Sequence, residues 1–303
     1  MTESMIVIDV GSGTQDILLY QPEKALENCP KFIVPSRTQI VAAQIREATE
    51  LRRGIFMHGH LMGGGACALA VRKHMAAGLK AYATPQVALT FNDNLALVER
   101  MGVVLCDKAP EATRPIWLGD IDPLALRQAI EAFGLEYPQK LAVAVQDHGF
   151  SITESNRTLR FRLWEEFVRQ GGDLHKLNKG ILAVNIGNSH TLAAAICGER
   201  VYGIFEQHTS MLSLNSLAKL IQRFQTTELT NAEVFEQGGH GATLHPEMKS
   251  GWDFVAVTGP RRSLAKSLNW YEAAPYGDMM LTGCFGLLAG IKQNFENSKV
   301  FFK

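Results

Sequence analysis

The chain has 303 residues, enough for two domains of ordinary size, and 46% of them are hydrophobic, as in a globular protein with a real core. Thirty basic and thirty acidic residues cancel, so the composition shows no electrostatic footprint for nucleic acid or an anionic membrane. The sequence has no apolar run of membrane-spanning length and no charged-then-apolar leader, and we expect a soluble cytoplasmic protein.

The first strong pattern is a strand, a turn and a second strand over residues 5–19. Asp9 interrupts the first apolar run near its end, and a glycine-rich turn follows. Glycines let backbone N–H groups approach phosphate oxygens, hydroxyls add donors, and Asp9 can hold the Mg²⁺ that travels with a nucleotide. The alternative is a plain hairpin with a solvated Asp. The residues of this first turn are Gly11, Ser12, Gly13 and Thr14.

A strand at 31–34 and a helix at 38–53 come next, and a strand beginning at Gly54 then runs into a glycine–histidine loop at 58–66. A helix over 67–77 follows, so strand, glycine-rich loop and helix start together favour an anion site. We prefer a substrate anion to a metal, because the two histidines supply only two ligands. Close packing with surface histidines is the alternative. The candidates for substrate binding are His58, His60, Gly63 and Gly64.

Strands then alternate with helices as far as residue 145, which indicates an α/β layered structure. We predict strands at 79–83, 103–105, 116–118 and 141–145, and helices at 87–101 and 124–133. A helix at 155–169 follows, and we expect its arginines to be solvated.

A second copy of the first pattern covers residues 180–196. An apolar strand ends in Asn185, a small polar turn follows, and another apolar strand continues; Asn185 lies 176 residues after Asp9, about one domain length. Two such units predict two similar domains, each offering a phosphate hairpin to a cleft between them. The candidates in the second copy are Asn185, Gly187, Asn188, Ser189 and Thr191. A later glycine–histidine loop at 237–242 is either a ligand contact or an ordinary connection.

The two patterns together resemble the superfamily of acetate and sugar kinases, Hsp70 and actin, the actin-like ATPases. More narrowly, nearly the whole chain resembles a bacterial and archaeal family of unknown function, some members of which carry the label pyruvate formate-lyase activating enzyme. The superfamily resemblance implies an α/β duplicated ribonuclease-H-like fold, with ATP and Mg²⁺ bound between two lobes. On this basis we expect a first lobe at 1–179, with an α/β insertion at about 54–135 carrying part of the substrate site, and a second lobe at 180–303 that includes a terminal helix.

The resemblance also assigns roles to residues that follow two buried strands. Asp147 comes after the strand at 141–145 and would orient Mg²⁺ or a water, or act as a general base, with His148 adjusting the site; an Asp in an ordinary turn is the alternative. Gly259 follows the strand at 254–258 and would pack on the adenosine, although Pro260 departs from the usual pair of small residues. Arg261 and Arg262 follow, and by its chemistry either arginine, with Arg261 as our candidate, could stack on a base or reach a phosphate.

The implied function is a Mg²⁺-dependent small-molecule kinase or an ATPase, with Asp9 and Asp147 as the catalytic carboxylates and Asp9 as the Mg²⁺ ligand. The alternative is a non-catalytic sensor or structural protein that binds nucleotide or a phosphorylated ligand, because the second motif usually begins with Asp and Asn185 carries no charge. The five cysteines are scattered singly and form no CxxxCxxC cluster, so we exclude the radical-SAM activity that the label suggests. The sequence does not identify the substrate, a protein partner or an oligomeric state.

Overall fold

The computed structural model describes residues 3–145, 149–170, 177–198 and 200–298, without the side chains of 170, 177–179 and 294–298. The chain divides into two compact units, which we call unit 1 (residues 1–146 and 283–303) and unit 2 (residues 147–282). Among the described residues, none of the helices combines the length and the apolar character needed to cross a bilayer.

Unit 1 is built on a sheet with the strand order β3-β2-β1-β8. Its strands are β1 (Met5–Val10), β2 (Thr14–Tyr20), β3 (Lys31–Pro35) and β8 (Lys140–Ala144). The first three form an antiparallel meander, joined in part by the short helix η1 (Leu26–Asn28), and β8 pairs parallel to β1.

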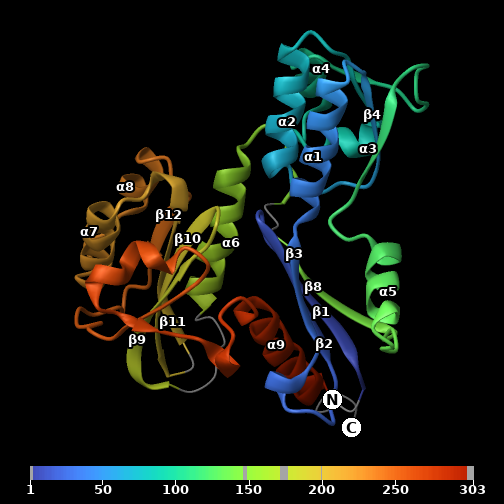
Figure 1. Ribbon diagram of the computed structural model, residues 1–303. Coiled ribbons are helices and arrows are strands. Elements are labelled where there is room, and N and C mark those ends of the chain that lie inside the picture. The colour runs from blue at the N-terminus through green and yellow to red at the C-terminus, as the bar shows by residue number, and fades with distance from the viewer. Residues whose placement is uncertain (1–2, 146–148, 171–176, 199, 299–303) are drawn as a thin grey trace. The chain divides into compact units, whose positions relative to one another are not determined.

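Two helices cover this sheet, α5 (Pro123–Ala132) and α9 (Thr282–Ser298) (Figure 1). Alternate residues of a strand point to opposite faces. Ile6 and Ile8 of β1 pack with Leu126 and Ile130 of α5. The thiol of Cys284 in α9 donates to the carbonyl oxygen of Val7, at 3.5 Å.

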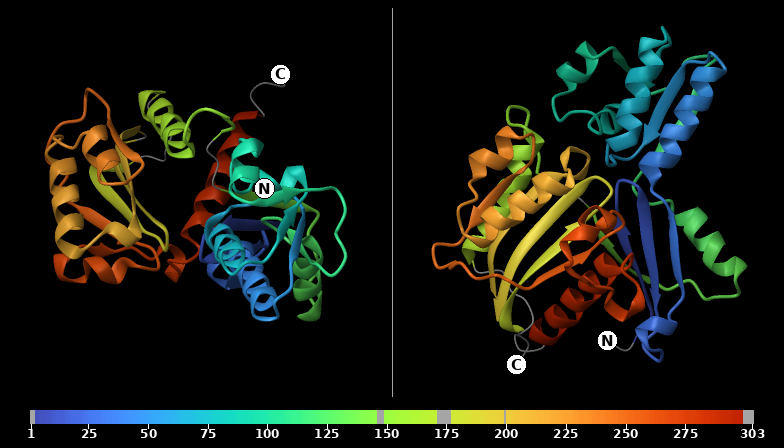
Figure 2. Two further views of the ribbon diagram at one scale, coloured as in Figure 1. Left: turned by 90° about the horizontal axis from the view of Figure 1, so that it is seen from above. Right: turned by 60° about the vertical axis from the view of Figure 1, so that its left-hand side comes forward.

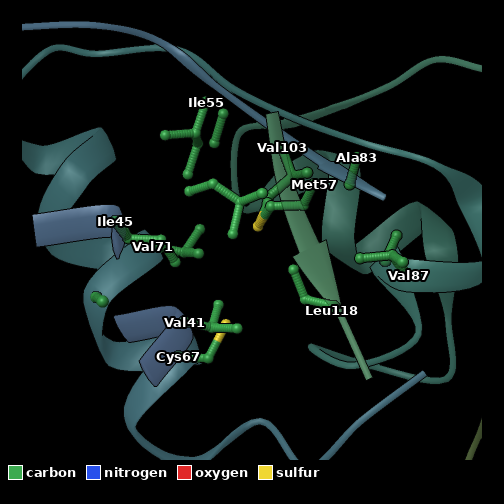
Figure 3. Close-up of a cluster of buried hydrophobic side chains, with 14 of the residues drawn as sticks. Val41, Ile45, Ile55, Met57, Cys67, Val71, Ala83, Val87, Val103 and Leu118 are labelled. Atoms are coloured by element: carbon green, nitrogen blue, oxygen red, sulfur yellow. The ribbon is translucent and has the colours of Figure 1, made fainter. Parts of the chain in front are cut away.

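A second, parallel sheet forms the insertion in unit 1, with the order β6-β5-β4-β7. Its strands are β4 (Ile55–Gly59), β5 (Ala81–Ala83), β6 (Val103–Leu105) and β7 (Arg114–Leu118). The helices around it are α1 (Arg37–Glu50), α2 (Gly65–Ala76), α3 (Pro85–Ala88) and α4 (Leu95–Arg100). Figure 3 shows their shared core, in which Val41 and Ile45 of α1 lie near Val71 of α2.

This core has bounds that differ from those of the insertion we predicted at about 54–135. The insertion includes α1, which packs on the parallel sheet, and it excludes α5, which packs on the first sheet.

The helix predicted at 87–101 is two helices. Asn94 breaks it, because the side chain of Asn94 caps α4 by accepting a hydrogen bond from the Ala96 N–H.

Unit 2 is built on a larger sheet with the order β12-β11-β10-β9-β13-β14. Its strands are β9 (Leu177–Ile186), β10 (His190–Gly198), β11 (Arg200–His208), β12 (Gly241–Leu244), β13 (Val255–Thr258) and β14 (Tyr271–Glu272). Strands β9, β10 and β11 form an antiparallel meander, and β13 pairs parallel to β9. The arrangement β3-β2-β1-β8 of unit 1 is therefore repeated as β11-β10-β9-β13.

Helices cover both faces of this sheet (Figures 1 and 2). The helix α7 (Leu214–Gln225), which begins at a Ser213 capping box, and α8 (Asn231–Glu236) pack on the side of Phe205. On the other side, α6 (Asn156–Gln170) packs against Val201 and Ile204 of β11. The remaining short helices are η2 (Thr209–Met211), η3 (Arg262–Leu268) and η4 (Pro275–Gly277).

The compact units divide the chain differently from the predicted lobes, 1–179 and 180–303. The helix α6 belongs to unit 2 because its apolar side chains pack on β11. The part of α9 from Gly283 onward belongs to unit 1, where Cys284 bonds to the strands β1 and β2.

Candidate functional site

The two glycine turns have the same backbone geometry. In the first, the Gly11 N–H donates to the Thr14 carbonyl at 2.9 Å; in the second, the Gly187 N–H donates to the His190 carbonyl at 2.9 Å. A Cβ at Gly11 or Gly187 would lie 2.9 or 2.7 Å from that carbonyl oxygen. Each turn therefore needs its first glycine because the chain folds back too closely for a side chain.

Both turns leave backbone donors available. The carbonyl of Ser12 accepts hydrogen bonds from the side chains of Ser36 and Gln39, and the carbonyl of Ser189 accepts one from the Thr209 N–H. Among the described residues, the N–H groups at positions 12, 13, 188 and 189 have no hydrogen-bond partner. Pairs of adjacent free N–H groups in a turn are suited to anion binding.

Asp9 is half-buried at the end of β1, and burial raises the pKa of its carboxyl above the ordinary value. The start of α9 comes very close to it, since a Cβ at Gly283 would lie 1.9 Å from Asp9 Oδ2. The positive end of the helix favours the charged carboxylate, in opposition to burial. The absence of a side chain at Gly283 thus allows the start of α9 to lie in close contact with the Asp9 carboxylate.

A second carboxylate, Asp16, lies directly opposite Asp9 in the β1–β2 ladder. Directly opposite side chains leave a sheet on the same face. Both charges also act on Cys284, whose pKa is raised to about 12 mainly by burial and then by these two neighbours. Sequence reasoning missed Asp16, although counting the hairpin register back from the turn places it opposite Asp9. Two carboxylates on one face are ligands that Mg²⁺ accepts.

The start of α1 joins the first turn to the glycine–histidine loop. Ser36 and Gln39 bond to Ser12, while the Thr38 hydroxyl donates to the Gly64 carbonyl at 2.8 Å and accepts from the Cys67 N–H at 3.0 Å. The structure therefore brings two of the predicted anion loops, 11–14 and 63–65, to one end of one helix. Sequence reasoning missed these three polar side chains, whose only signal was their position at the start of a helix.

Within the glycine–histidine loop, several predicted residues have packing partners. His58 stacks on Phe56 at 5.7 Å between ring centroids, and the exposed His60 meets Trp117 edge-on at 6.2 Å. The Gly63 N–H donates to Asp120 Oδ1 at 3.0 Å, and a Cβ at Gly64 would lie 2.9 Å from the Thr90 carbonyl oxygen. Burial raises the pKa of Asp120, more than the Gly63 hydrogen bond lowers it.

In unit 2, the structure brings Asn185, Gly259 and Arg261 together. Thr258 pairs with Asn185 in the parallel ladder, and the chain turns at Gly259 with φ +100°. A Cβ at Gly259 would lie 2.4 Å from Asn185 Oδ1, and the Arg261 N–H donates to the Ile186 carbonyl at 2.9 Å. The loop after β13 therefore lies against the end of β9, beside the second turn.

A cluster of three histidines lies at the same end of the unit 2 sheet. His190 and His208 are directly opposite each other in the β10–β11 ladder, and the His240 N–H donates to the carbonyl of Glu206. One ring nitrogen from each histidine lies within 4.8 Å of those of the others. Sequence reasoning missed this cluster, because its members come from three segments and show no ligand spacing.

The surroundings of the cluster are charged and buried. Glu206 is 2% exposed, and Arg160 of α6 binds it through two hydrogen bonds, one of them 2.9 Å from Nε. Burial acts to raise the Glu206 pKa, but His240 and Arg160 outweigh it, and the net pKa is lowered. Burial lowers the His190 pKa to about 4 and also lowers that of His208. Arg160 is thus not solvated, contrary to expectation.

The other predicted residues are placed as follows. Asp147 and His148 lie outside the described residues. Thr191 is fully buried, and its hydroxyl lies 3.0 Å from that of Thr209. Asn188 is exposed and Ser189 is half-buried in the second turn. The cleft expected between the lobes stays a prediction.

The strand order of the two sheets defines the class of protein. Each unit has an antiparallel three-stranded meander with a further strand parallel to its first strand, and helices on both faces. This is the duplicated ribonuclease-H-like fold of the actin-like ATPase superfamily, with an α/β insertion in unit 1.

The chain belongs to the family described as "Putative pyruvate format-lyase activating enzyme (DUF1786)", whose model matches residues 62–179 and 175–264. No curated protein matches the chain.

Two solved structures are similar to it at low identity. The ethanolamine utilization protein EutJ from Carboxydothermus hydrogenoformans is 10% identical with a TM-score of 0.27, over 93% of this chain and 87% of that one. The Ppx/GppA phosphatase of Aquifex aeolicus, type II variant, is 12% identical with a TM-score of 0.27, over 89% and 73%. Because these TM-scores are low, the fold assignment rests on the strand order.

Proposed function

We propose that the protein binds a nucleotide, ATP, together with Mg²⁺, and that it is a small-molecule kinase or an ATPase. The observation that carries this proposal is the pair of matching turns, each with two adjacent backbone N–H groups that have no partner among the described residues. Phosphoryl transfer requires mainly positioning and the stabilisation of negative charge, which such donors supply.

The residues at the first turn would divide the work between phosphate and metal. The N–H groups of Ser12 and Gly13 and the hydroxyl of Thr14 would hold phosphate oxygens. Asp9 would hold Mg²⁺ directly or through water, and the neighbouring Asp16 fits the same hard cation. When bound, Mg²⁺ supplies positive charge to the phosphates. Asp147 would position a water or a substrate hydroxyl.

The residues around the second turn would bind nucleotide as well. The N–H groups of Asn188 and Ser189 would hold phosphate, and Gly259 and Arg261 would contact the adenosine. The loop after β13 and the second turn could contact the same ligand, because Gly259 and Arg261 lie directly against Asn185 and Ile186.

A second candidate is a sensor that binds nucleotide or a phosphorylated ligand without turning it over. Asn185 and the opposing Leu192 favour this candidate, because the second turn has no carboxylate in the ladder where the first turn has two. A cation there would have an amide oxygen in place of a charge.

Thermal unfolding of the full chain with ATP or ADP, with and without Mg²⁺, and phosphate release from ATP together test the proposal. We expect Mg²⁺-dependent stabilisation and turnover that Asp9→Asn abolishes. Asp253→Asn, the same change at an exposed carboxylate, should leave both unchanged. Stabilisation without turnover would select the sensor, and no response to any nucleotide would refute both.

We also propose that the activity named in the family description does not belong to this chain. A radical-SAM activating enzyme holds its iron–sulfur cluster through three closely spaced thiolates. Here Cys29, Cys67 and Cys284 are buried in separate places. Burial raises the pKa of the Cys67 thiol to about 12, which opposes thiolate formation.

A further inference from the structure

The histidine cluster of unit 2 has the composition of a metal site that the nucleotide proposal does not use. His190 ends the second turn, His208 ends β11, and His240 precedes β12. We propose that these three histidines bind a divalent transition metal of the zinc type through their ring nitrogens.

The geometry is close to that of a bound metal. One nitrogen from each ring lies within 4.8 Å of the others. Nitrogens that share a tetrahedral zinc at about 2.0–2.1 Å lie roughly 3.4 Å apart. Side-chain rotations that move each nitrogen by about 1 Å inward would therefore close the site. The ring centroids are already 4.7–5.0 Å apart, from the His190–His208 pair to the His208–His240 pair.

The backbone fixes the positions from which the three imidazole rings project. His190 and His208 are a cross-strand pair, so their side chains leave the same face of the sheet. His240 is fixed by the hydrogen bond from its N–H to the Glu206 carbonyl at 2.9 Å. Glu206 lies two residues before His208, on the same face. Ligands on paired strands are more precisely held than ligands on loops.

A carboxylate supports the cluster from outside. Glu206 Oε2 lies 3.3 Å from Nδ1 of His240, the arrangement by which a second-shell carboxylate orients a metal-binding imidazole. Arg160 holds Glu206 in place with two hydrogen bonds, so Glu206 acts as a positioning residue and is not counted as a ligand. Three histidines leave a fourth position for water or an anion oxygen.

The ligand chemistry separates this site from the proposed Mg²⁺ site. Imidazole nitrogens suit zinc, copper and nickel, whereas Mg²⁺ prefers the oxygens of carboxylates. The charges nearest the cluster are Glu206, Arg160 and Arg157, and the Arg157 guanidinium is held by the Phe235 and Gly239 carbonyls. The three ligands are all side chains of this protein, so the site should load metal in the absence of nucleotide.

Metal titration of the full chain, stripped with a chelator and free of nucleotide, tests the proposal. We expect one equivalent of Zn²⁺ by calorimetry and elemental analysis. Co²⁺ should give a visible spectrum with no thiolate charge-transfer band, unchanged after alkylation of the cysteines. His208→Asn and His240→Asn should each weaken binding at least 100-fold, and Glu206→Gln should weaken it about tenfold.

The matched control is His60→Asn, which removes one exposed imidazole in unit 1. It should bind metal as the unchanged chain does. Circular dichroism tests whether each variant folds. If a variant does not fold, the Co²⁺ spectrum of the unchanged chain still identifies the type of ligand. Absence of stoichiometric binding, a thiolate band, or equal weakening by His60→Asn would overturn the proposal. Metal binding without any nucleotide response would refute the proposed function and leave this site standing.

Discussion

The first and second turns share a backbone conformation but differ in the side chains that surround them. Both close with a hydrogen bond from their first glycine to the fourth residue. Unit 1 places Asp9 and Asp16 opposite each other beside its turn, whereas unit 2 has Asn185 and Leu192 at the corresponding positions. The fourth residue is Thr14 in one and His190 in the other. The two turns therefore share one backbone conformation, while carboxylates stand beside the turn of unit 1 and imidazoles beside the turn of unit 2.

We expect the largest loss of stability from Gly283→Ala, which disturbs the Asp9 carboxylate beside the first turn. The new Cβ would lie 1.9 Å from Asp9 Oδ2, so the carboxylate or the helix start must move. We expect a loss of about 2–3 kcal/mol in the free energy of unfolding and the loss of any Mg²⁺-dependent stabilisation by nucleotide. Denaturant unfolding measures the first effect and thermal shift the second.

Gly286→Ala is the matched control in the same helix, because a Cβ there would meet none of the described atoms within 4 Å. Alanine is the better helix former, so this change should stabilise the protein by up to about 1 kcal/mol. Equal destabilisation by the two variants would mean that α9 simply tolerates no substitution.

Alanine at the first glycine of each turn tests the claim of a shared backbone. The added Cβ would lie 2.9 Å from the Thr14 carbonyl oxygen in Gly11→Ala, and 2.7 Å from that of His190 in Gly187→Ala. We expect each substitution to lower the free energy of unfolding by about 1–2 kcal/mol, as measured by denaturant unfolding. A loss of stability in only one of the two variants would mean that the two turns do not share a backbone requirement.

Asn185→Asp gives the second turn the charge that Asp9 gives the first. One added carboxylate near a bound cation contributes about 1 kcal/mol in a well-solvated site, or roughly fivefold in affinity. We expect Mg²⁺-dependent nucleotide affinity to rise by that factor in calorimetric titration. An unchanged affinity would separate the second turn from the proposed metal–nucleotide site.

The last prediction concerns a buried histidine of unit 1, for comparison with the histidine cluster of unit 2. His74 in unit 1 is fully enclosed, with Nε2 3.2 Å from the Lys80 carbonyl oxygen and Nδ1 2.8 Å from the Thr49 hydroxyl. Burial lowers its pKa from 6.5 more than the Lys80 hydrogen bond raises it. A lowered folded pKa favours the neutral form, so this stability is complete above pH 6.5 and is lost as the pH falls below it.

His74→Gln should therefore flatten the pH dependence of unfolding below pH 6.5, by at most about 1.4 kcal/mol per pH unit for one proton. Denaturant unfolding at several pH values measures the slope. Zn²⁺ binding should not change in this variant, because His74 has no part in the cluster of unit 2. An unaltered slope would mean that His74 titrates alike in both states.

Much of the local structure follows from the chain alone. Apolar runs predict the strands of both hairpins, and the glycines predict the turns, because the register of a hairpin is set by residues next to each other in sequence. The single helix predicted at 87–101 fails at Asn94, whose side chain caps a new helix by a local bond that periodicity does not report.

The amino-acid sequence is enough to predict the repeated strand–turn–strand pattern, the two close glycine turns and the α/β class, since these depend on neighbours in the chain. The folded chain was needed to show which helix packs on which sheet, that Gly283 lies against Asp9, and that His190, His208 and His240 lie together. Those contacts join residues far apart in sequence, and their free energy comes from burial and packing, which no local pattern records.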